Sequence, residues 1–326
     1  MNGAFRPCCI FKQPHPDNEY QFPRLTDHGV QEIWHSDELV RLRRDFRAGK
    51  RPADCAACWA EEDAGVKSYR QSYNERFAHL VDVTEDRPDA PVSMDLKLSN
   101  TCNLKCRICG PMASSTWLRE FLDHDLKGVD SEYADQLRTN ERYYKQEKII
   151  GQQSNEAVFV EWLRSVEHIE LTGGEPLISR ENVKLLELCT QMGVAGDIDL
   201  LIVTNATHFK RRFLEIFRSF RSVIINFSID DIADRFEYER HGASWADAVD
   251  VVRSFLAEAP DNVRFNIHCA VSIYNVYYLP EFVDWVATLQ PMRRVNLLLH
   301  LVHFDPHFCI ANLPPEAASV ISDRLA

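Results

Sequence analysis

Long apolar runs are missing from this sequence. No stretch of about 18 hydrophobic residues, the minimum for a bilayer-spanning helix, occurs in the 326 residues. The first residues do not combine a basic segment with a short apolar one, so we expect no secretory signal. Internal repeats and low-complexity tracts are also absent. We therefore expect a cytoplasmic globular protein that makes no use of a membrane.

An excess of positive charge is missing as well. Asp and Glu number 49 and Lys and Arg 37, so the formal net charge is −12, and no basic stripe runs along the chain. Proteins that hold nucleic acid neutralise phosphates with Lys and Arg, so a polynucleotide partner is not expected. A peptide or a small molecule remains compatible with this charge. A hydrophobic content of 45% is enough for a full core and for two folded units.

The ten cysteines do not have the arrangement of a disulfide framework. Cys102, Cys106 and Cys109 have the spacing C-x3-C-x2-C, and Cys55 and Cys58 form a C-x2-C pair. Such groups, without a secretory signal, indicate metal binding in a reducing compartment. Cubane iron–sulfur clusters normally take four thiolates, so three on one loop leave one iron open to a small molecule. A zinc site with a distant fourth ligand, or three unrelated buried thiols, would give the same spacing.

Two alternating segments place this loop in a fold. Residues 92–98 alternate apolar and polar side chains, so the cysteine loop follows the carboxyl end of a half-buried strand. Residues 168–172 form a second such segment and run into Gly173, Gly174 and Glu175, followed by a proline. Glycines directly after a strand permit close approach of the backbone to a ligand. A plain turn before a helix is the alternative.

The cysteine loop and the Gly-Gly-Glu-Pro run, in this order, resemble the signature of the radical S-adenosylmethionine (radical SAM) superfamily. The resemblance implies a [4Fe–4S] cluster whose open iron is chelated by the amino and carboxylate groups of SAM. It also implies that one electron cleaves SAM to release a 5′-deoxyadenosyl radical. The backbone of Gly173, Gly174 and Glu175 would then receive the SAM amino group. Ile108 departs from the family, which often has an aromatic residue before the third cysteine.

The rest of the chain continues as strands that alternate with amphipathic helical segments. The further strands are expected at 197–205, 222–230, 263–271 and 294–301, and helices at 211–220, 245–257, 279–289 and 315–326. This alternation predicts a parallel sheet. Six strands in all match the family's partial (β/α)6 barrel, so the predicted fold class is α/β. A charged stretch at 127–153 is expected to be a helical insertion.

Parallel barrels carry their chemistry at the carboxyl ends of the strands. The polar residues at these ends are Asn205, Ser228, Asp230, Ser272 and His300. By resemblance, Ser228 and Asp230 are polar SAM contacts, and Arg240 pairs with the SAM carboxylate, which suits a guanidinium group. A solvated helix surface is the alternative for Arg240. Asn205 either faces the SAM ribose or caps the next helix, and capping is slightly favoured.

The N-terminal ninety residues hold a second group of cysteines. The spacing Gly3-x4-Cys8, a gap, and then Cys55-x2-Cys58 resembles the twitch and SPASM auxiliary-cluster domains of radical SAM enzymes. The resemblance extends over residues 33–39, 41–49 and 58–70. It implies an auxiliary [4Fe–4S] cluster held by Cys8, Cys55 and Cys58. Because the family's first cysteine would precede Gly3, we expect a chain shortened relative to its relatives.

Cys9 is a candidate fourth ligand of this second cluster, although two adjacent cysteines on one cubane are sterically awkward. A [2Fe–2S] cluster, a zinc ion and no metal are the alternatives at this group. The predicted domains are residues 1–90, the twitch-like auxiliary domain, and residues 91–326, the barrel. Cys189 and Cys269 are expected to be buried, inert thiols.

The function predicted on this basis is a radical SAM enzyme that abstracts hydrogen from a substrate C–H bond. Peptide modification is the first substrate hypothesis, and an electron donor such as flavodoxin or ferredoxin is the expected partner. One alternative is a radical SAM enzyme that acts on a nucleotide or a sugar. The other is a non-catalytic iron–sulfur or zinc protein that senses redox state, which would have no need of a SAM site.

Overall fold

The computed structural model describes residues 5–12, 17–25, 27–80, 88–124, 135, 138, 153–302 and 305–326. Gly3 and nearly all of the predicted insertion at 127–153 lie outside the described residues. The chain divides into two compact units, Met1–Pro91 with Lys145–Ser165 and Val92–Tyr144 with Val166–Ala326. The domain boundary expected near residue 90 remains a prediction. In the described part of the chain, no helix has the length and apolar character needed to cross a bilayer.

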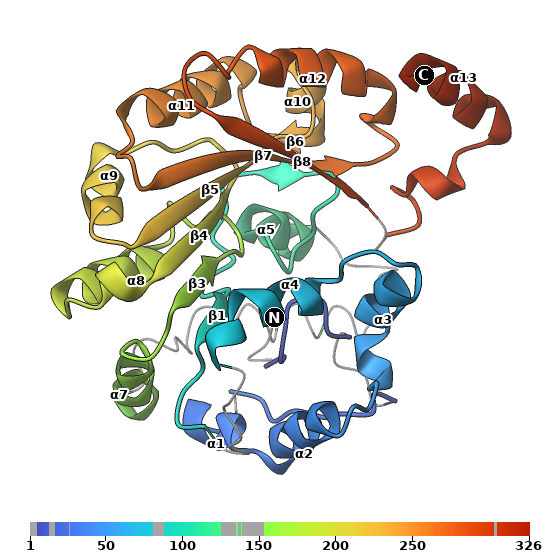
Figure 1. The fold of residues 1–326 in the computed structure, drawn as a ribbon. Coiled ribbons are helices and arrows are strands. Elements are labelled where there is room, and N and C mark those ends of the chain that lie inside the picture. The colour runs from blue at the N-terminus through green and yellow to red at the C-terminus, as the bar shows by residue number, and fades with distance from the viewer. Residues whose placement is uncertain are drawn as a thin grey trace. The chain divides into compact units, whose positions relative to one another are not determined.

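The second unit is built on a parallel sheet of six strands (Figure 1). Its strands follow one another in chain order: β1 (Ser93–Leu96), β3 (His168–Leu171), β4 (Asp199–Thr204), β5 (Ser222–Ser228), β7 (Val263–Val271) and β8 (Val295–Leu301). A short antiparallel pair, β2 (Lys105–Cys106) and β6 (Arg240–His241), stands apart from this sheet. The predicted fold class, a partial barrel of six parallel strands, is confirmed.

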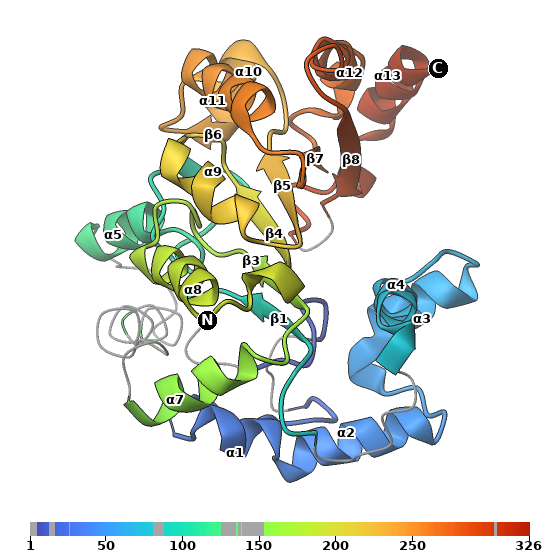
Figure 2. The same ribbon diagram turned by 60° about the vertical axis from the view of Figure 1, so that its left-hand side comes forward.

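Helices connect the strands and cover one face of the sheet (Figures 1 and 2). They are α5 (Ser115–Asp123), α8 (Arg180–Gln191), α9 (Arg211–Arg218), α10 (Ala233–Glu239), α11 (Trp245–Glu258) and α12 (Leu279–Ala287). A last helix, α13 (Pro315–Leu325), follows β8. The core lies between sheet and helices. Phe227 of β5 and Phe265 of β7 stack with ring centroids 5.7 Å apart, and Phe255 of α11 contacts both. Burial of each such side chain stabilises the folded state by about 1.5–3 kcal/mol.

The opposite, inner face of the sheet carries polar side chains beside apolar ones such as Leu201 and Ile224. Along β5, Val223, Ile225 and Phe227 are fully buried against the helices, whereas Asn226 lies between them on the other face. Parallel sheets are usually covered on both faces and read as apolar throughout. Asn226, a buried polar residue in the middle of β5, therefore departs from that pattern.

The first unit is made of short helices around an aromatic core. Its elements are α1 (Val30–Trp34), α2 (Asp37–Arg47), α3 (Ala56–Asp63), α4 (Tyr69–Arg76) and α7 (Gln153–Trp162). Phe11, Tyr20, Leu39 and Leu42 form the buried cluster. Ser36 caps α2, whose first turn is acidic and whose last turn is basic, as the helix dipole favours. The Lys12 N–H donates to the Asp54 carbonyl at 3.2 Å, which holds the segment of Cys8 close to the residues just before α3.

Candidate functional site

The cysteine loop follows β1 and is held by α5. The Ser115 hydroxyl exchanges hydrogen bonds with the backbone of Cys102, accepting from its N–H at 3.1 Å and donating to its carbonyl at 3.2 Å. The indole N–H of Trp117 donates to the Cys106 carbonyl at 3.0 Å. Cys106 also pairs with Arg240 in the β2–β6 ladder. The loop is thus anchored at its first and second cysteines.

The three thiols of this loop are half-buried and lie close together, so that Cys109 raises the pKa of both Cys102 and Cys106. Burial raises the pKa of all three, that of Cys106 to about 12. The Arg240 guanidinium opposes this effect at Cys106 and Cys109. Two donors point at the sulfur atoms: Arg240 Nη1 lies 3.9 Å from Cys106 Sγ, and Asn205 Nδ2 lies 3.9 Å from Cys102 Sγ. Negative charge on the sulfurs would be stabilised there.

The Gly173–Gly174 turn packs directly on the backbone of the cysteine loop. Gly173 has φ +122°, a conformation that favours glycine. A Cβ on Gly174 would lie 2.6 Å from the carbonyl carbon of Thr101 and closer still to its oxygen. The N–H of Gly174 donates to the Ser99 carbonyl at 3.3 Å, and the N–H of Glu175 donates to the Thr101 carbonyl at 2.7 Å. The second glycine is therefore required by contact with the cysteine loop itself.

The Glu175 side chain points into the protein and is 1% exposed. Its carboxylate accepts from the Thr204 hydroxyl at 2.7 Å, the Asn205 N–H at 2.6 Å and the Leu177 N–H at 3.0 Å. Burial raises the pKa of this carboxyl, and the same three donors oppose the rise. The carboxylate therefore ties the turn after β3 to the end of β4.

Asn205 holds a tight turn at the end of β4. Its side-chain oxygen accepts from the N–H and hydroxyl of Thr207, and its Nδ2 donates to Asn103 at 3.0 Å. The expectation that Asn205 caps the next helix is wrong, because α9 begins at Arg211 with Lys210 at the cap. The side chain instead reaches the cysteine loop, beside Cys102.

Asp230 and Arg240 form a buried ion pair after β5. Arg240 Nη2 lies 2.6 Å from Asp230 Oδ2, and the two side chains are 9% and 2% exposed. The other oxygen of Asp230 accepts from the Ala270 N–H at 2.8 Å. Arg240 Nε is buried and has no hydrogen-bond partner among the described residues. Ser228 is half-buried at the carboxyl end of β5. The solvated helix surface considered for Arg240 is wrong.

A polar row on the inner face of the sheet was not predicted from the sequence. Asn226, Asn266 and Asn296 occupy one register across β5, β7 and β8. Asn296 donates to Asn266 at 2.9 Å, and Asn266 donates to Asn226 at 2.8 Å. Nearer the carboxyl ends, the rings of His268 and His300 meet with centroids 4.3 Å apart. Period-two alternation of polar residues within each strand was the available signal.

The remaining strand-end residue and the two isolated cysteines have structural roles. Ser272 is fully buried, and its hydroxyl accepts from the Tyr274 N–H within a turn. Cys189 and Cys269 are fully buried, as expected, and burial raises the pKa of both thiols. None of these three residues offers an accessible reactive group.

Cys8, Cys55 and Cys58 come together in the first unit. Burial raises the pKa of Cys8 and raises that of Cys55 to about 12; the Cys58 thiol adds to the rise at Cys8, and Cys8 and Cys58 both add to the rise at Cys55. Asp54 braces this region by accepting from the Tyr20 N–H at 2.9 Å. Cys9 is half-buried in the same segment.

The residues after Cys58 form a brace of their own. The guanidinium of Arg70 binds both oxygens of Glu62, at 2.9 and 2.7 Å, and lies over the ring of Trp59. The Ser68 hydroxyl donates to the same carboxylate. Gly65 turns the chain back with φ +74°. These contacts give a physical role to the pattern at 58–70 and fix α3, which carries Cys58.

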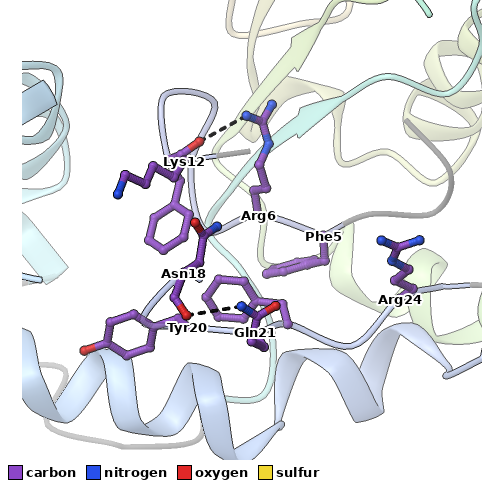
Figure 3. A pocket seen from close by; sticks show the side chains of 9 residues that line it. Phe5, Arg6, Lys12, Asn18, Tyr20, Gln21 and Arg24 are labelled. Carbon is purple, nitrogen blue, oxygen red and sulfur yellow. Dashed lines mark hydrogen bonds between the residues drawn. The ribbon is translucent and has the colours of Figure 1, made fainter. Parts of the chain in front are cut away.

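A small pocket lies in the same unit (Figure 3). Its lining combines aromatic rings with basic and amide side chains: Phe5, Arg6, Phe11, Lys12, Asn18, Tyr20, Gln21, Phe22 and Arg24. Arg6 donates to the Phe11 carbonyl at 3.2 Å, while Lys12 and Arg24 lie on opposite sides of the pocket. The cationic groups therefore do not gather around one point.

The donor sets fit iron–sulfur clusters. Each holds three thiols, soft ligands suited to such clusters, and the barrel set has two hydrogen-bond donors aimed at its sulfurs. Among the described residues, no three His, Cys, Asp or Glu side chains converge to hold a single metal ion. A cubane is held at several iron atoms, so its thiolates need not converge on one point.

Fold and site together define an iron–sulfur protein with a partial barrel. A family model described as the radical SAM superfamily matches residues 96–268, more than half of the chain. The chain belongs to the radical SAM superfamily, which implies a [4Fe–4S] cluster and SAM as its cofactors. A second model, described as an iron–sulfur cluster-binding domain (SPASM), matches residues 1–59, as the N-terminal cysteines predicted.

Known proteins resemble the chain only distantly. No curated protein matches it. One similar solved structure is native anSMEcpe with bound AdoMet: identity is 16%, TM-score 0.48, and the match covers 72% of this chain and 60% of that one. A second is Streptococcus suis SuiB bound to S-adenosylmethionine: identity is 16%, TM-score 0.34, and the match covers 73% of this chain and 54% of that one. The chain thus spans about 60% of the length of the first of these proteins.

Proposed function

We propose that this chain is an enzyme that cleaves SAM reductively and abstracts hydrogen from a C–H bond of a peptide substrate. One observation carries the proposal: the glycine turn after β3 is hydrogen-bonded to the cysteine loop after β1, at Ser99 and Thr101. Two segments far apart in the sequence, each matching part of one cofactor signature, meet at the carboxyl ends of adjacent strands. A redox sensor would have no need of this junction.

The chain's residues hold and orient the cofactors. Cys102, Cys106 and Cys109 would ligate the cluster. When bound, the cluster supplies the electron that splits SAM into methionine and a 5′-deoxyadenosyl radical, which removes hydrogen from the substrate. The residues proposed to contact SAM are Gly173, Gly174, Glu175, Asn205, Ser228, Asp230 and Arg240. Because Glu175 and Asp230 have their carboxylates engaged by the protein, Glu175 would act through its backbone and Asp230 through Arg240.

The first unit would add a second cluster. Cys8, Cys55 and Cys58 are its proposed ligands, with Cys9 as the candidate fourth, and residues 1–90 are the proposed auxiliary domain. The proximity of the three thiols supports this assignment. Flavodoxin or ferredoxin is the proposed electron donor for the barrel cluster.

The inner face of the sheet is the proposed substrate surface. The row Asn226, Asn266 and Asn296 presents amide groups, which match the donors and acceptors of a peptide backbone. His268 and His300 lie nearer the carboxyl ends of β7 and β8 than this row, the ends at which SAM is proposed to bind. A candidate peptide deuterated at its target carbon should transfer deuterium to 5′-deoxyadenosine. Transfer from a nucleotide or a sugar instead would replace the peptide assignment.

The test of the proposed function uses the Cys106→Ala variant. After anaerobic reconstitution and reduction with dithionite, the wild-type chain should form 5′-deoxyadenosine from SAM, and the variant should form none. Cys189→Ala is the matched control, because it removes a thiol buried in α8 away from the loop. SAM cleavage by Cys106→Ala at the wild-type rate would refute the ligand assignment, and no cleavage by wild type would favour the sensor.

A further inference from the structure

Two Asp–Arg pairs follow β5, and they differ in what they face. Arg235 lies 2.8 Å from Asp231, also pairs with Glu281, and remains 31% exposed. Arg240 lies 2.6 Å from Asp230, is 9% exposed, and directs Nη1 at Cys106 Sγ. Only the second pair therefore places a buried charge against a cysteine of the barrel loop.

The position of the Arg240 guanidinium is fixed from two sides. Asp230, which holds Nη2, is itself fixed by the Ala270 N–H of β7. The backbone of Arg240 pairs with Cys106 in the β2–β6 ladder. A fixed, buried cation acts strongly on its neighbours, because little water screens it and no reorganisation is needed.

Reduction of an iron–sulfur cluster adds one electron and forms or breaks no covalent bond. Hydrogen bonds to the cluster sulfurs, net charge and solvent exposure set its potential. A cation beside a ligating sulfur stabilises the added electron, and a carboxylate at the same place opposes it. The two members of the pair therefore have opposite effects.

We propose that Asp230 and Arg240 set the reduction potential of the cluster at Cys102, Cys106 and Cys109, Arg240 raising it and Asp230 lowering it. The inference rests on the proposed function, because it requires that cluster. Arg240 is here a positioning residue that acts through the Cys106 sulfur. A purely structural role, holding β6 against the cysteine loop, predicts no opposite effects of the two residues.

The experiment is a redox titration monitored by electron paramagnetic resonance, without SAM. It uses the full chain with Cys55→Ala and Cys58→Ala, so that the barrel cluster is observed, and titrated dithionite supplies the electron. Arg240→Gln should lower the equilibrium constant for reduction about tenfold, a shift of about 59 mV to lower potential. Arg240→Lys keeps the charge and should stay near the parent, whereas Asp230→Asn should shift the potential upward. Arg235→Gln is the matched control and should leave it unchanged.

The outcomes separate this inference from the proposed function. A parent chain that loads no cluster at the barrel loop contradicts the proposed function. A parent that loads the cluster and cleaves SAM, with equal potentials in Arg240→Gln and Asp230→Asn, overturns the inference alone. Shifts of one sign in both variants also overturn it, since lost structure would act alike in both. If Arg240→Gln loads no cluster, Asp230→Asn decides: a raised potential supports the inference, and an unchanged one refutes it.

Discussion

Replacement of Gly174 by alanine should damage the cysteine loop rather than SAM binding alone. The added Cβ would lie 2.6 Å from the Thr101 carbonyl carbon and 2.7 Å from that of Asn100, both backbone atoms that no rotamer change can move. Overpacking of this kind costs about 1–3 kcal/mol. Separation of the two loops would also break the hydrogen bonds at Ser99 and Thr101, each worth about 1 kcal/mol. The expected loss is therefore about 3–5 kcal/mol of unfolding free energy.

The assay for this prediction compares urea unfolding of the apoprotein and iron content after reconstitution. Gly110→Ala is the matched control, because Gly110 follows Cys109 directly and a Cβ there would meet no atom within 4 Å. We expect Gly174→Ala to unfold at lower urea and to retain less iron in the barrel site, and Gly110→Ala to match wild type. Equal unfolding midpoints for the two variants would refute the contact argument.

Three further predictions concern charge and iron. Burial, together with the charges of Asp230 and Asp231, raises the pKa of Glu239 from 4.5 to about 8, so between these pH values the folded state keeps a proton that the unfolded chain releases. The free energy of unfolding should therefore fall as the pH rises through this range, by at most about 1.4 kcal/mol per pH unit. The urea midpoints measured at pH 5.5 and at pH 7.5 should differ less in Glu239→Gln than in the wild-type chain. Iron should fall from about eight to about four atoms per chain in a Cys55→Ala, Cys58→Ala variant that still cleaves SAM; unchanged iron would exclude the auxiliary cluster. Glu175→Gln should lower the urea midpoint, because it replaces one of two buried acceptor oxygens by an NH2 group that would face an N–H or O–H donor. An unchanged midpoint would contradict the bracing role of the Glu175 carboxylate.

The strands were predictable because one face of each is buried against helices. The alternation along 263–271 matches β7, where every second residue is buried, and the apolar run at 200–203 lies within β4. The same alternation along β7 also placed Asn266 and His268 on the inner face, but site residues were predicted only at the strand ends. Asn266 and His268 were missed for that reason, since neither stands at the end of β7.

The contacts of the glycine turn were not predictable from its sequence. Glycines after a strand indicate close approach, but not to which atom. In the structure the contact is with the Thr101 carbonyl, part of a loop that comes before α5, α7 and β3 in the chain. The prediction that Asn205 caps a helix failed for the same reason. Capping depends on residues nearby in the chain, whereas the partners of Asn205 include Asn103 from the same distant loop.

The order of the sheet explains how an irregular loop becomes a defined ligand set. The turn after β3 bonds to Ser99 and Thr101, the turn after β4 reaches Cys102 and Asn103, and the segment after β5 reaches Cys106. Supports along the loop thus follow the order of the strands in the sheet. Because the strands run parallel, their carboxyl ends meet at one edge, and each end can supply one contact. The regular sheet therefore fixes the cysteine loop, so a substitution in any of these three turns should disturb the cysteine nearest its own contact first.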